Sequence, residues 1–397
     1  MKKILSISAL AAIAAALVSC YPQDEIYKEY VVVGGLTYPA KSLNLKSSPG
    51  LNRVVLSWDL PMDPSIRTAK IFWDNYVGSM DVDYAQFPKG HVEISIGDLE
   101  ERSYTFDVVN YDDKGNKSLA AEITSRPLGS SWLVTHSERK VTSCYMDGDD
   151  AVINLSRATD EMIGTKFKVY DLGGNLVESS VILKPEENSV RIPGVKKGKK
   201  FFYTSGYYEK NAADTIWNSS WNKSAIGIPY PLPTSSWTGT VTAEQTRSGY
   251  GIEKVFDGSL DDSANRWFSS SNTTYRNKFP KILSFDTAVP EGQECYTLVG
   301  FDLYQHPTTA TYRYMRDVYI YAGMSAFDPD DSDYANTFGE PDAILSVPQT
   351  EQVYTSWLKD PVQARYFAIA FKNSRSSYGY IDLWELVPYG FLESETE

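Results

Sequence analysis

Histidine, cysteine and recognised catalytic motifs are scarce in this sequence. Its 397 residues include only three histidines, His91, His136 and His306, which lie far apart. No G-x-S-x-G, H-E-x-x-H or glycine-rich phosphate loop occurs. The sequence therefore lacks the signatures of serine hydrolases, zinc proteases and nucleotide-binding enzymes, and we predict that the protein is not an enzyme. A glycosidase that uses two of its 51 carboxylates is the catalytic alternative.

The three cysteines do not form a recognisable framework. Cys20 ends the N-terminal apolar segment, and neither a CxxC motif nor a zinc-type spacing includes Cys144 or Cys295. We assign these last two cysteines to different domains. The sequence therefore predicts no disulfide and two buried thiols.

Long hydrophobic runs are absent except at the N-terminus. Two lysines precede an apolar run over residues 4–18, which is shorter than the roughly 20 residues needed to span a bilayer. This arrangement predicts a signal peptide over residues 1–19. The run ends in Leu-Val-Ser-Cys, which resembles the bacterial lipobox and implies lipidation of Cys20. An ordinary secretory cleavage site is the alternative.

The residues behind Cys20, YPQDE, resemble the acidic export tag that sends some lipoproteins to the outer face of the outer membrane. The resemblance implies a lipid-anchored, surface-exposed protein of the outer membrane, and a periplasm-facing anchor is the alternative. Without residues 1–19 the chain has 36 basic and 51 acidic residues, a net charge of −15. Such a charge disfavours nucleic acid as a partner and suits neutral ligands or cations.

Alternating apolar residues predict short strands behind a membrane tether at residues 20–39. The first set covers residues 53–58, 69–73, 91–96 and 99–109, and places Tyr104, Phe106 and Val108 inward. Short strands separated by turns favour a β-sandwich, here over residues 40–128. The same layout returns over residues 129–228, with strands expected at 151–155, 165–170, 190–195 and 201–208.

Both sandwiches resemble fibronectin type III modules, through Ser57-Trp58 and the Leu99…Tyr104-Thr105-Phe106 pattern of the first copy. The second copy lacks the tryptophan. Together they resemble a domain of unknown function from surface lipoproteins of glycan-foraging bacteria, which implies a spacer role. A proline-rich stretch, IGIPYPLPTSS, then predicts an extended linker over residues 229–236.

Residues 237–391 are again rich in strand patterns, with a short tail at 392–397. Strands are expected at 281–286, 298–304, 316–321, 365–371 and 381–386, without a long helical period, and a jelly-roll sandwich fits this layout. The fold class predicted for the whole chain is therefore all-β, with two tandem fibronectin type III-like sandwiches followed by a jelly roll.

The order of short motifs in this last segment resembles the discoidin, or coagulation-factor C-type (F5/8 type C), family with the galactose-binding-like fold. The motifs are VFDGSLDDSANRWFSS, KILSFD, LVGFDLY, DVYIYAGMS, ARYFAIAFKNS and DLWELVPYG. The resemblance implies a non-catalytic carbohydrate-binding domain. It also implies that Trp267 is a core residue.

Acidic residues surround the turn at Gly258, and hard cations bind where one loop supplies several oxygens. The family resemblance implies a structural calcium ion held by Asp257, Asp262 and Glu385. Asp261 leaves open which aspartate of the 257–262 stretch ligates the metal, and an ordinary solvated turn is the alternative. A second acidic stretch, residues 328–333, lacks the glycine of an EF-hand and is interpreted as a solvated loop.

The resemblance also implies a sugar site at the loop end of the jelly roll. Sugars stack their C–H faces on aromatic rings, while fixed polar groups bind their hydroxyls. Tyr378 lies in a loop where an aromatic side chain has little packing reason to be. The candidate ligand-binding residues are His306, Arg313, Asn373, Arg375, Tyr378, Tyr275 and Arg276.

These observations predict a cell-surface lipoprotein that binds polysaccharide or oligosaccharide non-catalytically and assists polysaccharide capture. Outer-membrane glycan-uptake proteins are the partners that the resemblance adds. The alternative is a protein-binding adhesin or an assembly component of an outer-membrane complex.

Overall fold

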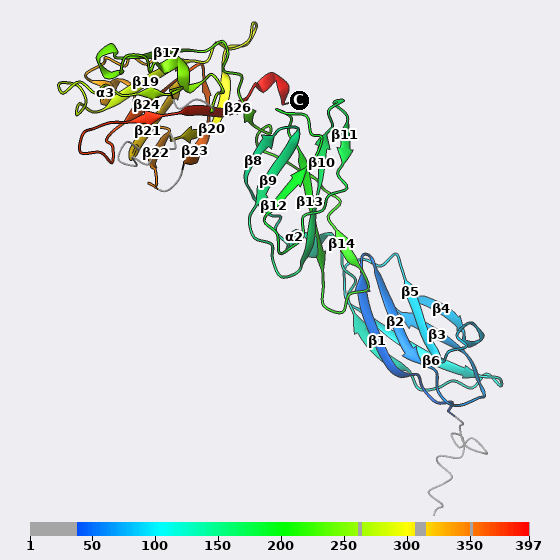
Figure 1. The fold of residues 1–397 in the computed structure, drawn as a ribbon. Helices are drawn as coiled ribbons and strands as arrows, with labels where there is room; N and C mark the ends of the chain where they lie inside the picture. Colours follow the sequence, from blue (N-terminus) through cyan, green and yellow to red (C-terminus); the bar gives the residue numbers. More distant parts are fainter. Residues whose placement is uncertain (1–37, 261–263, 306–314, 350–351, 397) are drawn as a thin grey trace, which may run out of the picture. The chain divides into compact units, whose positions relative to one another are not determined.

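A computed structural model describes residues 38–260, 264–305, 315–349 and 352–396, and the fold is almost entirely β (Figure 1). The all-β prediction is confirmed. The chain divides into two compact units. The first contains the residues up to Thr135 together with Lys210–Asp214, and the second contains His136–Glu209 and Thr215–Glu397.

The first unit contains a sandwich of two antiparallel sheets. One sheet has the order β1 (Leu43–Gly50), β2 (Arg53–Asp59), β5 (His91–Ile96), and the other β4 (Gly78–Asp83), β3 (Ile66–Trp73), β6 (Tyr104–Asp112), β7 (Ala121–Ser125). The predicted inward residues Tyr104, Phe106 and Val108 are buried. Trp58 is fully buried and donates to the Tyr84 hydroxyl at 3.1 Å, so its polar nitrogen is satisfied inside the core.

The second sandwich repeats this strand order. Its sheets are β8 (Val141–Asp147), β9 (Asp150–Leu155), β12 (Ser189–Ile192), and β11 (Leu176–Glu178), β10 (Met162–Tyr170), β13 (Phe202–Tyr208), β14 (Thr215–Trp217), with β15 (Asn222–Lys223) also paired to β13. In both copies the second strand lies between the first and the fifth. The internal repeat expected from the sequence is therefore confirmed by the topology.

The proline-rich segment, predicted to be an extended linker, is packed into the second unit. Ile228, Tyr230 and Leu232 are all buried, and strand β16 (Tyr230–Pro231) pairs with β26 (Glu385–Phe391) of the C-terminal domain. Every second residue of this segment is apolar, and that alternation places one side of the chain in the core. The prolines lie between these positions, at the edge of the sheet, where no ladder hydrogen bond is lost.

The C-terminal domain is the predicted sandwich of two antiparallel sheets. The strands are β17 (Thr238–Val241), β19 (Lys281–Asp286), β24 (Tyr366–Phe371), β21 (Asp317–Gly323), β22 (Ala343–Ser346) in one sheet, and β16, β26, β20 (Tyr296–Tyr304), β23 (Val353–Ala364) in the other. A two-stranded ribbon, β18 (Trp267–Phe268) with β25 (Asp382–Leu383), lies at one end. The single strand expected at 381–386 is divided at Trp384 into β25 and β26.

Helices are short. They are α2 (Ser130–Val134), α3 (Tyr334–Thr337) and the 3-10 helices η3 (Tyr84–Gln86), η4 (Ala243–Gln245), η5 (Ile252–Val255) and η7 (Glu393–Glu395). None of the helices within the described ranges has the length and apolar character needed to cross a bilayer.

Both cysteines of the described chain have free thiols, as predicted. Cys144 is buried, and burial raises the pKa of its thiol to about 12. Cys295 is only half-buried, so the expectation of two buried thiols is wrong for this residue. It precedes β20 directly, where the chain enters the sheet from the surface.

One continuous apolar core runs through the second unit, from the second sandwich into the C-terminal domain. Phe367 lies at its centre, with ring centroids 4.7 Å from Phe285, 5.1 Å from Phe301 and 5.4 Å from Trp237. Trp267 is fully buried and stacks on Phe371 at 5.8 Å, which confirms its assignment to the core.

Phe367→Ala is expected to destabilise the second unit by about 3–5 kcal/mol, because it removes ring contacts to three neighbours and leaves a cavity. Ile344→Ala is the matched control, since Ile344 lies on β22 of the same sheet and is 66% exposed. We expect that control to change stability by less than about 0.5 kcal/mol. Denaturant unfolding of both variants tests the prediction, and equal losses would contradict it.

Candidate functional site

Two loops at one end of the C-terminal sandwich bring together Tyr378 and Arg276. Tyr378 is 53% exposed and stacks on Tyr380, with centroids 6.0 Å apart and an interplanar angle of 21°. The Arg276 guanidinium lies 5.2 Å from the centroid of the Tyr378 ring, within cation–π distance. The structure therefore unites two of the predicted ligand-binding residues on an exposed aromatic surface.

Gly379 allows these loops to approach so closely. Its φ is +71°, and a Cβ atom there would lie 2.2 Å from the Arg276 carbonyl oxygen. Any other residue would both strain the backbone and push the loops apart. The glycine between Tyr378 and Tyr380 is thus part of the site's construction.

Tyr275, the third predicted residue in this region, is half-buried in the loop between β18 and β19. The Lys278 ammonium lies 4.9 Å from the Tyr275 ring centroid. The loop is held from below by Lys281, which is fully buried and donates to the carbonyl oxygens of Tyr275 at 3.3 Å and Lys278 at 3.2 Å. Burial lowers the pKa of Lys281 to about 8.

Lys281 was not predicted from the sequence. It is the first residue of the strand KILSFD, whose other residues through Phe285 are also buried. A charged residue that begins a mostly apolar strand was the available signal.

Asn373 and Arg375 lie in the loop behind β24, but their side chains bind other parts of the fold. Asn373 donates from Nδ2 to Asp317 at 2.5 Å and accepts from the Asp317 amide at 3.0 Å. Arg375 donates to the Val347 carbonyl oxygen. These bonds join the ends of β21, β22 and β24, so both residues brace the loop. His306 and Arg313 lie outside the described residues.

The predicted metal-binding residue Glu385 lies beside the turn that contains Asp257. The Gly258 amide donates to Glu385 Oε1 at 3.4 Å, while Oε2 of the same buried carboxylate has no hydrogen-bond partner within the described chain. Burial, together with the negative charge of Asp257, raises the pKa of Glu385 to about 7. Cys20 and Asp262 lie outside the described residues.

A calcium ion fits this arrangement. A buried carboxylate oxygen without a partner, beside a second carboxylate, is stabilised by a hard cation. Asp257 at present accepts from Asn265 Nδ2 at 2.9 and 2.8 Å and from the Ser259 amide at 2.9 Å, which fixes its orientation in the turn. No cluster of three His, Cys, Asp or Glu side chains occurs in the part of the chain described, so further oxygens, from the backbone or from outside these residues, would have to complete the coordination.

The second acidic stretch is used by the local backbone. Asp328 accepts from the Asp330 amide at 2.9 Å, and Asp331 accepts from the Asp333 amide at 2.7 Å and from the Thr337 hydroxyl. These bonds shape the turn that leads into α3.

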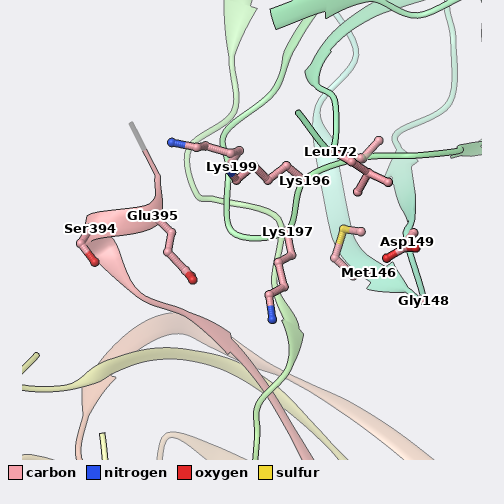
Figure 2. Close-up of a pocket in the computed structure, with 10 residues that line it drawn as sticks. Met146, Gly148, Asp149, Leu172, Lys196, Lys197, Lys199, Ser394 and Glu395 are labelled. Carbon is pink, nitrogen blue, oxygen red and sulfur yellow. The ribbon is translucent and has the colours of Figure 1, made fainter. Parts of the chain in front are cut away.

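A cavity of about 480 Å³ lies in the second unit, and none of the described site residues lines it (Figure 2). Ser394 and Glu395 line one side of it, Met146 and Asp149 the other, and three lysines project between them. Glu395 accepts from the Tyr230 hydroxyl at 2.9 Å, and the Lys197 ammonium lies 4.3 Å from the Tyr230 ring centroid. Two of the charged residues that line the cavity, Lys197 and Glu395, therefore both contact Tyr230.

Glu385 gives a pH test of the metal site. Because its pKa is raised in the folded state, its contribution to stability is present below about pH 4.5 and is lost as pH rises through about 7. In chelator we expect wild-type protein to lose about 3 kcal/mol over this interval, and Glu385→Gln to lose much less. Calcium should offset the loss in the wild type only. Thermal unfolding from pH 5 to 8 measures this.

Glu291→Gln is the control for that experiment, because Glu291 is exposed on a loop of the same domain. It should follow the wild-type curve in both buffers. A wild-type midpoint that calcium does not raise at pH 8 would contradict the metal site.

Lys281 gives a second test. Its folded-state pKa is lowered, so the stability of the protein should rise with pH between about 8 and 10.5, where the unfolded state binds more protons. Lys281→Met removes the buried charge at similar volume and should raise the unfolding midpoint at pH 7 while abolishing this rise. Lys359→Met, at an exposed position, should do neither. A lower midpoint for Lys281→Met would show that its carbonyl bonds outweigh desolvation.

Comparison with solved structures found several sugar-binding domains. One is the family 32 carbohydrate-binding module of NanJ from C. perfringens, solved with galactose, at 15% identity and a TM-score of 0.32, covering 41% of this chain and 99% of that chain. Another is a fucolectin from striped bass, Morone saxatilis, at 9% identity and a TM-score of 0.31, covering 74% and 84%. A SusE-like protein matches at 10% identity and a TM-score of 0.32, covering 88% and 96%.

The search of curated proteins gave no match. Among protein-family models, residues 20–216 match DUF4998, a domain of unknown function, which covers the first sandwich and most of the second.

Proposed function

We propose that this protein is a surface lipoprotein that binds glycan non-catalytically through its C-terminal domain and assists polysaccharide capture. The observation that carries the proposal is the exposed Tyr378 ring, stacked on Tyr380, with the Arg276 guanidinium beside it. An exposed ring supplies the flat apolar face on which a sugar stacks, and a guanidinium supplies fixed donors for hydroxyls. Core packing gives no reason for a tyrosine to remain half exposed there.

The construction of the loops supports the same function. Gly379 permits their close approach, and Lys281 holds the carbonyl groups of the Tyr275–Lys278 turn. Binding residues held by such contacts lose less entropy when a ligand binds. Asn373 and Arg375 contribute by bracing the loop behind β24, because their side chains bind Asp317 and Val347.

Asp257 and Glu385 would hold the structural calcium ion, with Asp262 or Asp261 as a further ligand. The ion would be the positively charged partner of the buried Glu385 carboxylate. Its role is to fix the start of β26 to the turn at Gly258, because these two segments are far apart in the chain.

The N-terminal half serves, in this proposal, as the fibronectin type III-like spacer between a lipid on Cys20 and the glycan-binding domain. Residues 17–20 and the acidic residues behind them support an anchor in the outer membrane with surface exposure. Glycan-uptake proteins of the outer membrane are the partners that would receive the captured polysaccharide.

Tyr378→Ala is expected to weaken glycan binding by about 10-fold or more, because the sugar loses its stacking surface. Calorimetry against a panel of polysaccharides identifies a ligand for the wild type and then compares the variant. Tyr208→Ala, which removes a tyrosine 45% exposed on the second sandwich, is the control and should bind like wild type. If no polysaccharide binds in calcium while a pull-down captures an outer-membrane protein, the adhesin alternative holds instead.

A further inference from the structure

The aromatic surface around Tyr378 continues across three neighbouring backbone segments. Phe268 lies 5.7 Å from Tyr380, and Tyr250 lies 5.8 Å from Phe268, measured between ring centroids. With Tyr378 these rings form a row that we call the tyrosine strip, which consists of Tyr250, Phe268, Tyr380 and Tyr378. Tyr378 is 53% exposed, and Tyr250 and Tyr380 are partly exposed. Phe268 is buried, with the Arg247 guanidinium over its ring.

The backbone beneath the strip is a hydrogen-bonded ribbon. Arg247 N donates to Phe268 O at 2.9 Å, and Ser270 N donates to Gln245 O at 2.8 Å. On the other side of β18, Ser269 N donates to Ile381 O at 2.9 Å, and Phe268 pairs with Asp382. These hydrogen bonds hold the segments that carry Tyr250, Phe268 and Tyr380 next to one another.

Arginines flank the strip at both ends. Arg276 lies beside Tyr378, and the exposed Arg247 places its guanidinium 5.2 Å from Phe268 and 5.5 Å from Tyr250. Neither guanidinium is within salt-bridge distance of a carboxylate in the described ranges. By contrast Arg266, which also lies against Tyr250 at 4.9 Å, is buried and paired with Asp382 at 3.5 Å.

Both guanidinium groups thus have no carboxylate partner among the described residues, although the chain carries a net charge of −13. The acidic residues on the Arg247 segment, Glu244 and Glu253, are exposed, and neither forms an ion pair with it. A neutral sugar would need only one donor set beside its stacking ring. Two guanidinium groups at the ends of a row of rings instead match a ligand that carries carboxylates along its length.

We propose that the tyrosine strip, with Arg247 and Arg276, binds an acidic oligosaccharide whose uronate residues extend beyond the sugar stacked on Tyr378. This inference rests on the proposed glycan-binding function and names its ligand class. Successive sugar rings cover Tyr378, Tyr380 and Tyr250, and the uronate carboxylates accept from the two arginines. The sugar over Tyr378 is the common anchor, and Tyr250 with Arg247 forms the extension.

The test is calorimetry of the full protein in calcium with oligosaccharides released from a panel of polyuronates. Each is supplied as a hexamer and a dimer, and again after carboxyl reduction, which keeps linkage and length but removes charge. We expect one hexa-uronate to bind at least 10-fold more tightly than its reduced form. Tyr250→Ala and Arg247→Gln should each weaken that hexamer by about 5- to 10-fold and leave the dimer unchanged. Tyr378→Ala should weaken both lengths.

Lys359→Gln controls for the loss of one positive charge elsewhere on the domain, and unchanged unfolding midpoints show that each variant is folded. Equal affinity for charged and reduced hexamers, or wild-type affinity in Arg247→Gln, overturns the acidic extension while the glycan-binding function stands. Binding of no oligosaccharide, charged or reduced, also overturns the acidic extension, and the polysaccharide panel described for Tyr378→Ala then decides whether the glycan-binding function stands.

Discussion

The contact between the buried Glu385 carboxylate and the Gly258 amide joins segments 127 residues apart, and one end of the C-terminal domain depends on it. Glu385 begins β26, and the residues just before it, β25, pair with β18. The segment behind the Gly258 turn leads into β18. A single carboxylate therefore ties together the turn, the ribbon and the closing strand, and the calcium proposal depends on its second oxygen, which has no hydrogen-bond partner among the described residues.

Buried charge is concentrated at this end of the domain. Glu385, Lys281 and Arg266 are each buried, although burying a charge lowers stability unless it is fully compensated. Lys281 has carbonyl oxygens rather than a carboxylate as partners, and Arg266 is paired with Asp382. Buried charges that lower the stability of the fold are typical of functional sites, where the charged groups hold the surrounding loops in position.

The second sandwich and the C-terminal domain share one hydrophobic core, so they are not two separate domains joined by a flexible linker. Tyr145 of β8 stacks on Trp357 of β23 at 5.7 Å and meets Tyr389 of β26 at 6.3 Å. The Met146 amide also donates to the Pro229 carbonyl oxygen at 2.7 Å. The segment that looked like a spacer because of its prolines is part of this junction, since its alternate apolar residues are buried.

The sequence alone determined the all-β class, the repeated sandwich and most strand positions, because a period of two in apolar residues depends only on which side of a strand faces the core. Strands β2, β5 and β19 lie within a residue of their predicted bounds. It also brought Tyr378, Arg276, Asp257 and Glu385 into one hypothesis, through the order of motifs.

Only the tertiary structure decided which of the predicted ligand-binding side chains are free to bind a ligand. Asn373 and Arg375 are polar loop residues in the sequence, yet Asp317 and Val347, which are distant in the chain, use their hydrogen-bonding groups. Tyr250, Phe268 and Tyr380 belong to three separate segments, and no local pattern indicates that they form one row. Their adjacency comes from long-range backbone pairing, which a linear pattern of residue types does not encode.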